Sequence, residues 1–385
     1  MSKDQEFLDQ IMGFDPSDLS AFQEQSGSAN EDPQVYKTNP VRMSKTEDGH
    51  YHATVRVLYN PFSIKESIIK QVVYSMQDEN GFFKANSSLS VGDKNCPLFK
   101  SWKKLHFAKK TDGSEDLIRK TWGDKMYSKR EARWVLVQII EDENQPELVG
   151  QIKAWKLPKA IWTKMDSKMN PSADSKKAPV ALMDYLFGPI LTLDVAPGPE
   201  DAQHPERKER EISYDTCEFE SDPHPIVMVT SEGEVEPLFN DDEIEQIENY
   251  FEAKQAIAKA SIAINSGKKL TAKEEKKVEE HKKTVESLTD DIKKLYMKAI
   301  KYMKENAFDI SEKFGYSGWD ADLTVRVNSW IEKVANLQDP SVSSYGVAAE
   351  KPAAPKVPDA ASDLEEDDVF GEAMEESDEE GDLPF

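Results

Sequence analysis

The spacing of apolar residues changes once along this chain, and that change limits the folds open to it. Between His52 and Phe219, apolar and polar residues alternate in several short runs, which is typical of half-buried β-strands. After Phe239 the spacing becomes helical. Strands followed by helices, rather than strands alternating with helices, favour an α+β fold.

The strand-like part predicts a small barrel. Asp78-Glu-Asn-Gly81 is typical of a hairpin turn, and residues 160–169 have a helical pattern. Several strands with uneven loops and one interposed helix fit an OB-fold, a small Greek-key barrel, although other β-barrels fit as well. The predicted strands are residues 52–59, 67–76, 133–140, 149–157, 190–195 and 212–219.

The helical part predicts a hairpin. A helix capped by Asp241 or Asp242 ends at Ser266-Gly267, and Thr271 with Glu274 forms a capping box for the next one. The second helix repeats apolar residues every seven positions, at Val278, Val285, Ile292 and Ala299. The short turn favours an antiparallel hairpin within one chain over a dimeric coiled coil. His281 on this seam is expected to be a half-buried residue rather than a ligand.

The end of the chain is acidic. Residues 359–385 hold thirteen Asp or Glu and no Lys or Arg, so they are expected to form a solvated, disordered tail. Asp382, Leu383, Pro384 and Phe385 place an apolar ring on a flexible tether, which suits capture by a partner pocket. A tail that serves only solubility is the alternative.

These patterns divide the chain into four parts. We expect an acidic N-terminal arm at residues 1–33, a barrel core at 34–238, a helical hairpin and helical region at 239–338, and a linker with the acidic tail at 339–385. The net charge of -24 is uneven, because the tail supplies -13, whereas residues 36–195 hold 26 basic and 19 acidic residues, a net of +7. A basic body between acidic ends indicates a polyanion-binding protein.

Three features bear on the compartment. Cys96 and Cys217 are too few for a disulfide framework, which favours a reducing, intracellular setting. The N-terminus lacks an apolar signal stretch. The most apolar window, residues 179–196, is short and holds Asp184 and Asp194. We therefore expect a cytoplasmic protein without a membrane partner.

The segment from Lys94 to Trp134 mixes twelve basic residues with six aromatic ones and only five acids. Cations track a phosphate backbone and flat rings stack on unpaired bases, so this mixture suits single-stranded nucleic acid. Trp134 opens a strand and is expected in the core, and paired lysines are often only a solvated surface. The candidate contacts are Lys100, Trp102, Lys103, Lys104, Phe107, Lys109, Lys110, Arg119, Lys120, Trp122, Tyr127, Lys129, Arg130 and Arg133.

A second basic and aromatic element follows at residues 153–164. On a strand, Lys153 and Trp155 face the same side. We predict that Trp155 stacks on a base and that Lys156 and Lys159 contact phosphate, together with Lys153, whereas Trp162 on the next helix is expected in the core.

An ordered set of segments, residues 52–61, 96–97, 129–137 and 150–162, resembles the core of the T-even phage single-stranded DNA-binding, or helix-destabilising, proteins. The resemblance covers residues 50–195 well and 210–250 weakly. It implies an OB-fold that holds single strands in a basic, aromatic-lined cleft, and an acidic tail that recruits replication proteins. The tip at 382–385 is closer to that of bacterial single-stranded DNA-binding proteins, in which a terminal Pro-Phe docks in partner pockets.

The chain departs from that family in two ways. The family carries a zinc ion held by one His and three Cys, but here only Cys96 remains, and Val73, Asn86 and Phe99 stand at the other positions. One thiolate cannot make a tetrahedral site, so we predict no zinc and no other cofactor, with Val73 and Phe99 packing in its place. The family's cooperative N-terminal arm is basic whereas this one is acidic, so the family's cooperative contact does not carry over.

The sequence therefore predicts a protein that coats and protects single-stranded DNA during replication, recombination and repair, and that recruits polymerase, helicase, primase or recombination mediators through its tail. An enzyme is not expected, because the six His are scattered and no Gly-rich phosphate loop appears. The free protein is expected to be a monomer, and self-association on DNA is left open. The alternative is an acidic protein-interaction or chaperone-like module.

Overall fold

The computed structural model describes residues 3–13, 37–38, 51–78, 80–107, 109, 113–114, 116, 127–143, 145–172, 177–197, 212–230 and 234–337. Most of the predicted arm at 1–33 and all of the predicted linker and tail at 339–385 lie outside these residues.

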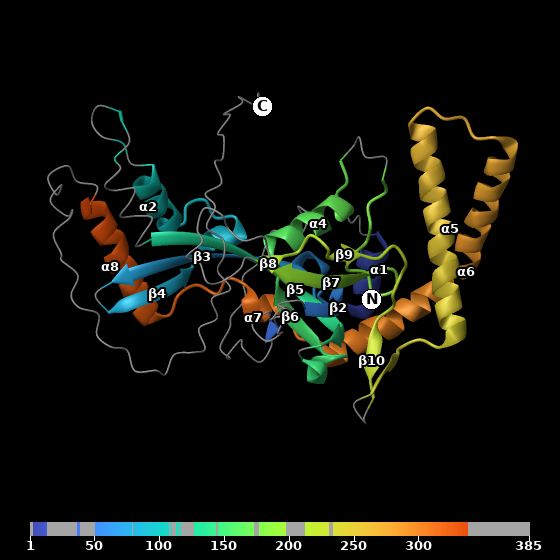
Figure 1. Cartoon of the computed structure of the whole chain (residues 1–385), viewed down its shortest axis with the longest axis horizontal. Coiled ribbons are helices and arrows are strands. Elements are labelled where there is room, and N and C mark those ends of the chain that lie inside the picture. Colours follow the sequence, from blue (N-terminus) through green and yellow to red (C-terminus); the bar gives the residue numbers. More distant parts are fainter. Residues whose placement is uncertain are drawn as a thin grey trace.

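One long strand organises the fold. β5 (Tyr127–Asp142) pairs antiparallel with β3 (Ile68–Asp78) along its first half and with β2 (Tyr51–Leu58) along its second half. β6 (Ile152–Lys156) pairs antiparallel with the middle of β5. Because β2 and β3 follow each other along β5, the strand is shared by two lobes (Figure 1).

The remaining strands extend this sheet. β4 (Gly81–Asn86) forms a hairpin with β3, and β7 (Ile190–Pro197) pairs with β2. The short strands β1 (Lys37–Thr38), β8 (Ile212–Ser213) and β9 (Glu218–Phe219) pair with β6, β7 and β7 respectively, and only β1 pairs in parallel. A separate ribbon joins β10 (Val227–Val229) to β11 (Val235–Pro237). Among the described residues, 3-10 turns are formed by η4 (Ile64–Glu66), η5 (Ser88–Val91) and η6 (Pro146–Leu148).

Helices cover the two lobes differently. α2 (Pro97–His106) and α8 (Ala321–Leu337) lie with the β3–β4 hairpin at one end of the long axis, and we call this part the distal lobe (Figure 1). α1 (Lys3–Gly13) and α4 (Lys159–Met169) lie with β2, β5, β6 and β7 in the central lobe. α5 (Asp241–Asn265) and α6 (Ala272–Asn306) form the hairpin at the other end.

Each lobe has its own apolar core. The central core includes Val57, Val137, Trp155 and Leu193 and is joined by Ile300 of α6. The distal core brings Tyr74, Phe83 and Tyr127 of the sheet against Leu98 of α2 and Trp330 of α8. The chain reaches α8 from the hairpin through α7 (Ile310–Phe314), whose Phe314 stacks on Trp134 at 4.4 Å between ring centroids.

Polar contacts fix α8 on the distal lobe. The Trp319 indole N–H donates a 2.6 Å hydrogen bond to the Asn86 carbonyl just before α8 begins. Within α8, Arg326 pairs with Asp78 through two hydrogen bonds, of 2.9 Å and 2.8 Å, and its guanidinium lies over the ring of Phe83. α8 therefore covers the apolar core beside the β3–β4 hairpin, although the two are far apart in the sequence.

A buried polar network holds the hairpin to the central lobe. Arg56 is fully buried, and its guanidinium donates to the carbonyls of Leu182, Asp184 and His224. Burial lowers the pKa of Arg56 to about 10, and nearby Asp184 works against that shift. The Asp184 carboxylate in turn accepts a hydrogen bond from Tyr296 of α6, so the network connects sheet and hairpin.

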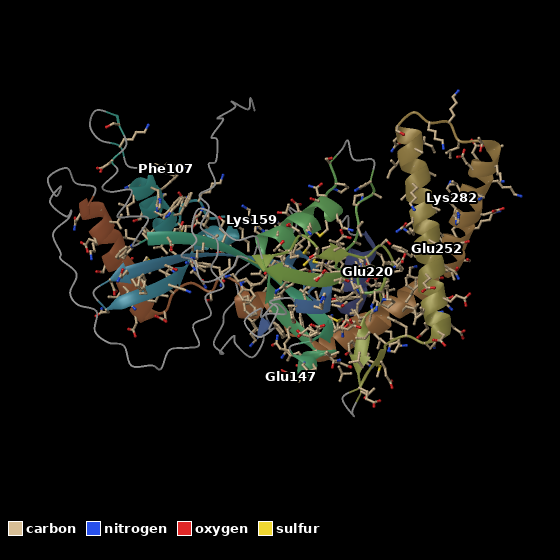
Figure 2. The ribbon with its side chains drawn as sticks, viewed as in Figure 1. Phe107, Glu147, Lys159, Glu220, Glu252 and Lys282 are labelled. Carbon is tan, nitrogen blue, oxygen red and sulfur yellow. The ribbon has the colours of Figure 1, made fainter. Side chains whose placement is uncertain are left out.

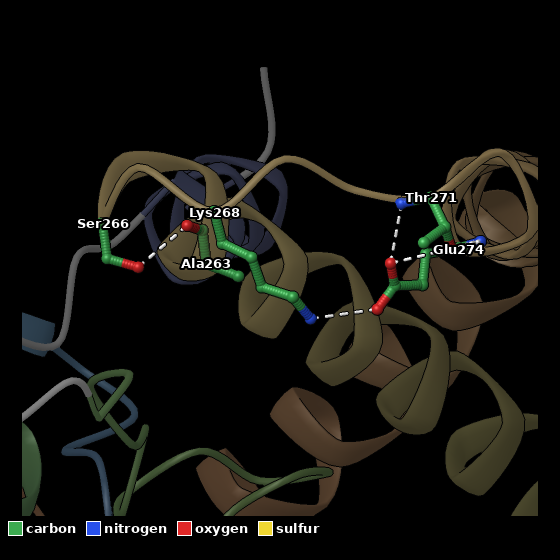
Figure 3. Close-up of polar contacts among 5 residues, drawn as sticks. All are labelled: Ala263, Ser266, Lys268, Thr271 and Glu274. Atoms are coloured by element: carbon green, nitrogen blue, oxygen red, sulfur yellow. Dashed lines mark hydrogen bonds and ion pairs between the residues drawn. The ribbon is translucent and has the colours of Figure 1, made fainter.

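The turn between α5 and α6 is capped on both sides (Figure 3). Ser266 closes α5 by donating to the Ala263 carbonyl, and Gly267 follows with φ of +85°. Glu274 accepts from the Thr271 backbone N–H at 2.7 Å and from Lys268 Nζ at 3.0 Å. The capping box predicted at Thr271 is confirmed, and it fixes the direction in which α6 leaves the turn.

The structure confirms the α+β class and the antiparallel helical hairpin, and it changes several details. Residues 212–219 do not form one strand, because a turn at 215–216 leaves two strands of two residues each. Asn240, rather than Asp241 or Asp242, caps α5 through its side chain. The predicted packing of Val73 is wrong: Phe99 packs on the distal core, but Val73 pairs with Arg130 on the opposite face of the sheet.

Candidate nucleic-acid interface

The first half of β5 carries charged residues between two helices. Because side chains alternate along a strand, Lys129, Glu131 and Arg133 point to one face of the sheet. Lys70 of β3 stands directly opposite Arg133 and shares that face. We call these four residues the β5 row, which brings three cations and one carboxylate together from β3 and β5.

α2 flanks one end of the row with aromatic rings. The Lys129 ammonium lies 5.0 Å from the centroid of the Trp102 ring, within the range of a cation–π contact. Trp102 also stacks on Phe99, with centroids 6.4 Å apart and ring planes 15° apart. The Trp102 indole N–H is buried without a hydrogen-bond partner. Phe107, at the end of α2, meets Trp102 edge-on and is 62% exposed.

α4 flanks the other end. The Arg133 guanidinium carbon lies 4.6 Å from the centroid of the Trp162 ring, and Trp162 is half-buried on α4. Lys159 begins α4 and is exposed. Figure 2 shows Phe107 and Lys159 on the same side of the sheet, one at the end of α2 and the other at the start of α4. The row is therefore bracketed by two pairs, each made of a cation and an indole ring.

One carboxylate sets the charge balance of the row. Glu131 Oε2 lies 3.3 Å from Lys70 Nζ, and Glu131 Oε1 lies 3.4 Å from Lys129 Nζ. Burial works to raise the pKa of Glu131, but Lys70 and Lys129 outweigh it and hold that pKa below its usual value. Glu131 thus stays ionised and leaves the row with a net charge of +2, from three cations and one anion.

The other predicted cations are divided between the two faces. Lys100, Lys103 and Lys104 are exposed on α2, and Lys109 is exposed after it. Arg130 and Lys156 are exposed but point to the face opposite the β5 row, since Arg130 neighbours Lys129 and Lys156 pairs with Trp134. Lys153 is half-buried on the row's own face, and burial lowers its pKa.

Two of the aromatic residues predicted to contact DNA, Tyr127 and Trp155, are buried in the structure. Both were expected to contact DNA, but Tyr127 has no exposed surface and Trp155 is 1% exposed. Tyr127 lies in the distal core and donates to the Leu98 carbonyl at 2.7 Å, and Trp155 lies in the central core. A ring enclosed in a core has no face to offer a base, so the prediction is wrong for both.

Some predicted contacts lie outside the described residues. These are Lys110, Arg119, Lys120 and Trp122 in the segment before β5, and Asp382, Leu383, Pro384 and Phe385 in the tail.

Sequence reasoning missed some members of the site. Lys70 was not predicted, because only the β3–β5 register places it beside Glu131 and Arg133. Trp162 was predicted as a core residue, and it does pack on the central core, yet its ring also receives Arg133. The local signal for a surface at this end of α4 was the mixture of basic and aromatic residues at 153–164.

Cys96, the one candidate zinc ligand left in the sequence, is buried. The Cys96 sulfur is buried 2.9 Å from the Ser87 hydroxyl, and Val73 pairs with Asn86 across β3 and β4. Within the described residues, no group of three or more His, Cys, Asp or Glu could hold a metal ion. No helix in the described part of the chain is long and apolar enough to cross a bilayer.

Comparison with known proteins gives no relative on which to base a function. No protein-family model matches the chain, and no curated protein shows significant sequence similarity to it. Any functional assignment therefore depends on the chemistry of the residues themselves.

Proposed function

We propose that this protein binds single-stranded DNA without reading its sequence, and coats and protects it during replication, recombination and repair. One observation supports this most: Lys129 with Trp102 and Arg133 with Trp162 lie on one face of β5, between α2 and α4. The pairs join a cation that suits phosphate to a ring that suits an unpaired base.

The energetics favour a single strand over a duplex. Stacking of a base on an aromatic ring contributes about 1–3 kcal/mol and requires a base that is not already paired. Phe107, which is 62% exposed, offers such a surface beside Trp102. The exposed lysines of α2 add sequence-independent attraction for phosphates, so the combination suits coverage of a strand rather than readout of base edges.

The proposal includes an OB-type core. Support comes from the antiparallel pairing of β6, β5, β2 and β7, and from the helix α4 inserted between β6 and β7. It also agrees with the resemblance of residues 50–195 to the T-even phage single-stranded DNA-binding proteins. In that family the equivalent surface is a basic, aromatic-lined cleft.

Titration of labelled poly-dT at increasing salt tests the function. Each neutralised phosphate contributes about -0.7 to the slope of log affinity against log salt for single strands. Replacing both Lys129 and Arg133 by Gln should therefore make the slope shallower by about 1.4. An absence of binding at low salt would reject the proposal and leave the protein-interaction module as the better interpretation.

The opposite face supplies the matched control. Arg130→Gln with Lys156→Gln removes the same charge from neighbouring positions that face away from the row. This variant should keep a slope close to that of the parent protein. Equal losses from the two double variants would show that general positive charge, and not the β5 row, attracts the DNA.

The proposal also assigns the segment at 382–385 a role in recruiting replication proteins, on the basis of its acidic and apolar composition. Phe385→Ala should leave the affinity for an oligo-dT that holds one copy unchanged and reduce the capture of polymerase, helicase or primase by the immobilised protein. Retention of all these partners by the variant would remove this part of the proposal.

A further inference from the structure

The tip of the α5–α6 hairpin carries a surface that the proposed function does not use. An open hollow of about 600 Å³ lies between the end of α5 and the start of α6, within the range of about 300–1,000 Å³ that is typical of ligand sites. Its apolar lining comes from Ile264, Leu270 and Val278. Ile264 is 53% exposed, and because Leu270 and Val278 line the same hollow, the apolar surface here is shared by three residues rather than being a single scattered one.

The tip is rigid enough to hold a fixed shape. Ser266 and the Thr271 capping box end one helix and start the next, and Lys268 ties the turn to Glu274 (Figure 3). The residues that line the hollow are therefore carried by two capped helices and by a turn that the Lys268–Glu274 ion pair spans.

The charge around the hollow favours an acidic occupant. Lys268, Lys269 and Lys282 line it together with Glu275 and Glu279. Across residues 264–283 the tip has seven Lys and four Glu, a net of +3, in a chain whose net charge is -24. An acidic segment with an apolar side chain would match both the rim and the lining.

This chain contains such a segment. Residues 376–385 hold five acidic residues and no basic one, and they include Leu383, Pro384 and Phe385. The apolar residues match the lining formed by Ile264, Leu270 and Val278, and the acids match the lysines of the tip.

The shape of the molecule favours contact between copies. α8, the last helix described, lies at one end of the long axis, and the hairpin lies at the other (Figure 1). The 48 residues from Leu337 to Phe385 would span about 40 Å as a flexible coil. The tip of α5 and α6 on a following copy, placed in line on the same strand, is a target that does not require the segment to run back along its own molecule.

We propose that the hollow at the hairpin tip binds the Leu383-Pro384-Phe385 segment of a neighbouring copy, so that adjacent molecules on one DNA strand are linked head to tail. This inference rests on the proposed function, which supplies the strand that aligns the copies. A contact this small is weak alone, but alignment raises its effective concentration to the millimolar range, so it adds cooperativity.

A peptide test needs no DNA. A fluorescent peptide of residues 376–385 is titrated with the full chain carrying Phe385→Ala, so that its own tail does not compete. Saturable binding is expected, and Ile264→Asp in the protein or Phe385→Ala in the peptide should weaken it at least ten-fold. Val325→Asp is the control, because Val325 is also an exposed aliphatic residue, on α8, and it should leave binding unchanged.

Binding that Ile264→Asp does not weaken, or no saturable binding, would overturn the docking site. If oligo-dT displaces the peptide and Ile264→Asp does not weaken its binding, the peptide binds the β5 row. That result would also overturn the inference. Far-UV circular dichroism checks that the exposed substitutions leave the helices intact.

A DNA measurement separates this inference from the proposed function. With Ile264→Asp, affinity for an oligo-dT that holds one copy should stay the same, whereas cooperative filling of long poly-dT should fall. Equal cooperativity in the variant and the parent would reject the contact between copies. If the parent protein itself does not bind the short oligo-dT, the proposed function is rejected, whereas the peptide result still stands.

Discussion

The Tyr296 hydroxyl donates a 2.7 Å hydrogen bond to Asp184 Oδ2 in the interior of the central lobe. Burial raises the pKa of Asp184, while Tyr296, the backbone N–H groups of Phe187 and Leu186, and Arg56 hold it down. Tyr296 belongs to α6, so this single bond couples the ionisation of a core carboxyl to the attachment of the hairpin.

We predict that Tyr296→Phe lowers the free energy of unfolding by about 1–3 kcal/mol at neutral pH, because the buried Asp184 carboxyl loses a hydrogen-bond donor. A carboxyl with a raised pKa in the folded state contributes most at low pH, and that contribution is lost as pH rises through the folded-state value. Removing the Tyr296 donor raises the pKa of Asp184 further, so the loss of unfolding free energy in the variant should be smaller at acidic pH. Urea unfolding of parent and variant at several pH values measures this loss.

Tyr250→Phe is the control for this prediction, since Tyr250 packs on Phe187 at the same contact between hairpin and lobe. It should have a much smaller effect. A deficit in Tyr296→Phe that does not vary with pH would show that Asp184 is not the group affected.

Phe107 and Phe82 form a matched pair of exposed rings, at 62% and 72% exposure. Phe107 stands beside Trp102 at the end of the β5 row, whereas Phe82 lies in the β3–β4 hairpin. Phe107→Ala should weaken oligo-dT binding by about 1–3 kcal/mol, the contribution of one stacked base. Phe82→Ala should leave it unchanged, and fluorescence anisotropy compares the two. Similar losses would place the DNA on a different surface.

Trp330 anchors α8 in the distal core, where it meets Tyr127 and Phe83 edge-on at 5.8 Å and 6.4 Å. Trp330→Ala should destabilise the distal lobe by about 3–5 kcal/mol. Cys96 lies in the distal core and Cys217 in the central core. In the Trp330→Ala variant a thiol reagent should therefore label Cys96 faster than in the parent protein, while Cys217 stays protected. Mass spectrometry of the labelled peptides checks this.

Val325→Ala, at an exposed position of the same helix, is the control and should leave both thiols protected. Equal labelling of Cys96 and Cys217 in Trp330→Ala would show that the two lobes unfold together.

Gly150 and Gly267 both have positive φ, of +82° and +85°, but differ in their surroundings. A methyl group at Gly150 would meet Val229 and Val235, whereas none of the described atoms lies within 4 Å of one at Gly267. Gly267→Ala should cost about 1–2 kcal/mol for the left-handed backbone. Gly150→Ala should cost about 1–3 kcal/mol more because of overpacking. Thermal unfolding ranks them, and equal losses would contradict the contact with the β10–β11 ribbon.

His224 gives the protein a sensitivity to mild acid. Burial lowers the pKa of its imidazole, and the Arg56 guanidinium lowers it further. The unfolded chain therefore takes up a proton first, and stability should fall as pH drops below about 6.5. His224→Gln should flatten the dependence of unfolding free energy on pH as the pH falls below about 6.5. An unchanged profile in His224→Gln would assign the acid sensitivity to another group.

Local patterns predicted the elements of this fold better than their pairing. The heptad spacing from Val278 to Ala299 and the capping box at Thr271 depend on residues close in sequence, and both the hairpin and the cap follow from them. The β5 row depends on the register between β3 and β5, two strands separated by a long segment. No local pattern fixes that register.

The burial of Tyr127 and Trp155 also could not be predicted from local sequence patterns. Their basic neighbours suggested a surface, and Lys129 and Lys153 do share a face with Tyr127 and Trp155 respectively, so alternation along the strand does not separate rings from cations. What buries the two rings is cover from elements elsewhere in the chain. Tyr127 is enclosed by α2 and by α8, which lies almost two hundred residues further on. The composition indicated the chemistry of the site, whereas only the three-dimensional structure shows which aromatic side chains are exposed and which are buried.

The sharing of β5 between the two lobes has a mechanical consequence. Lys129 and Arg133 are four residues apart on one paired strand, which sets their Cα atoms about 13 Å apart. This spacing is fixed by covalent geometry and by the ladder to β3, which pairs with every residue from Lys129 to Arg133. A DNA strand held by both cation–indole pairs would be kept at a constant extension, and tension applied to it would load the backbone of β5 directly.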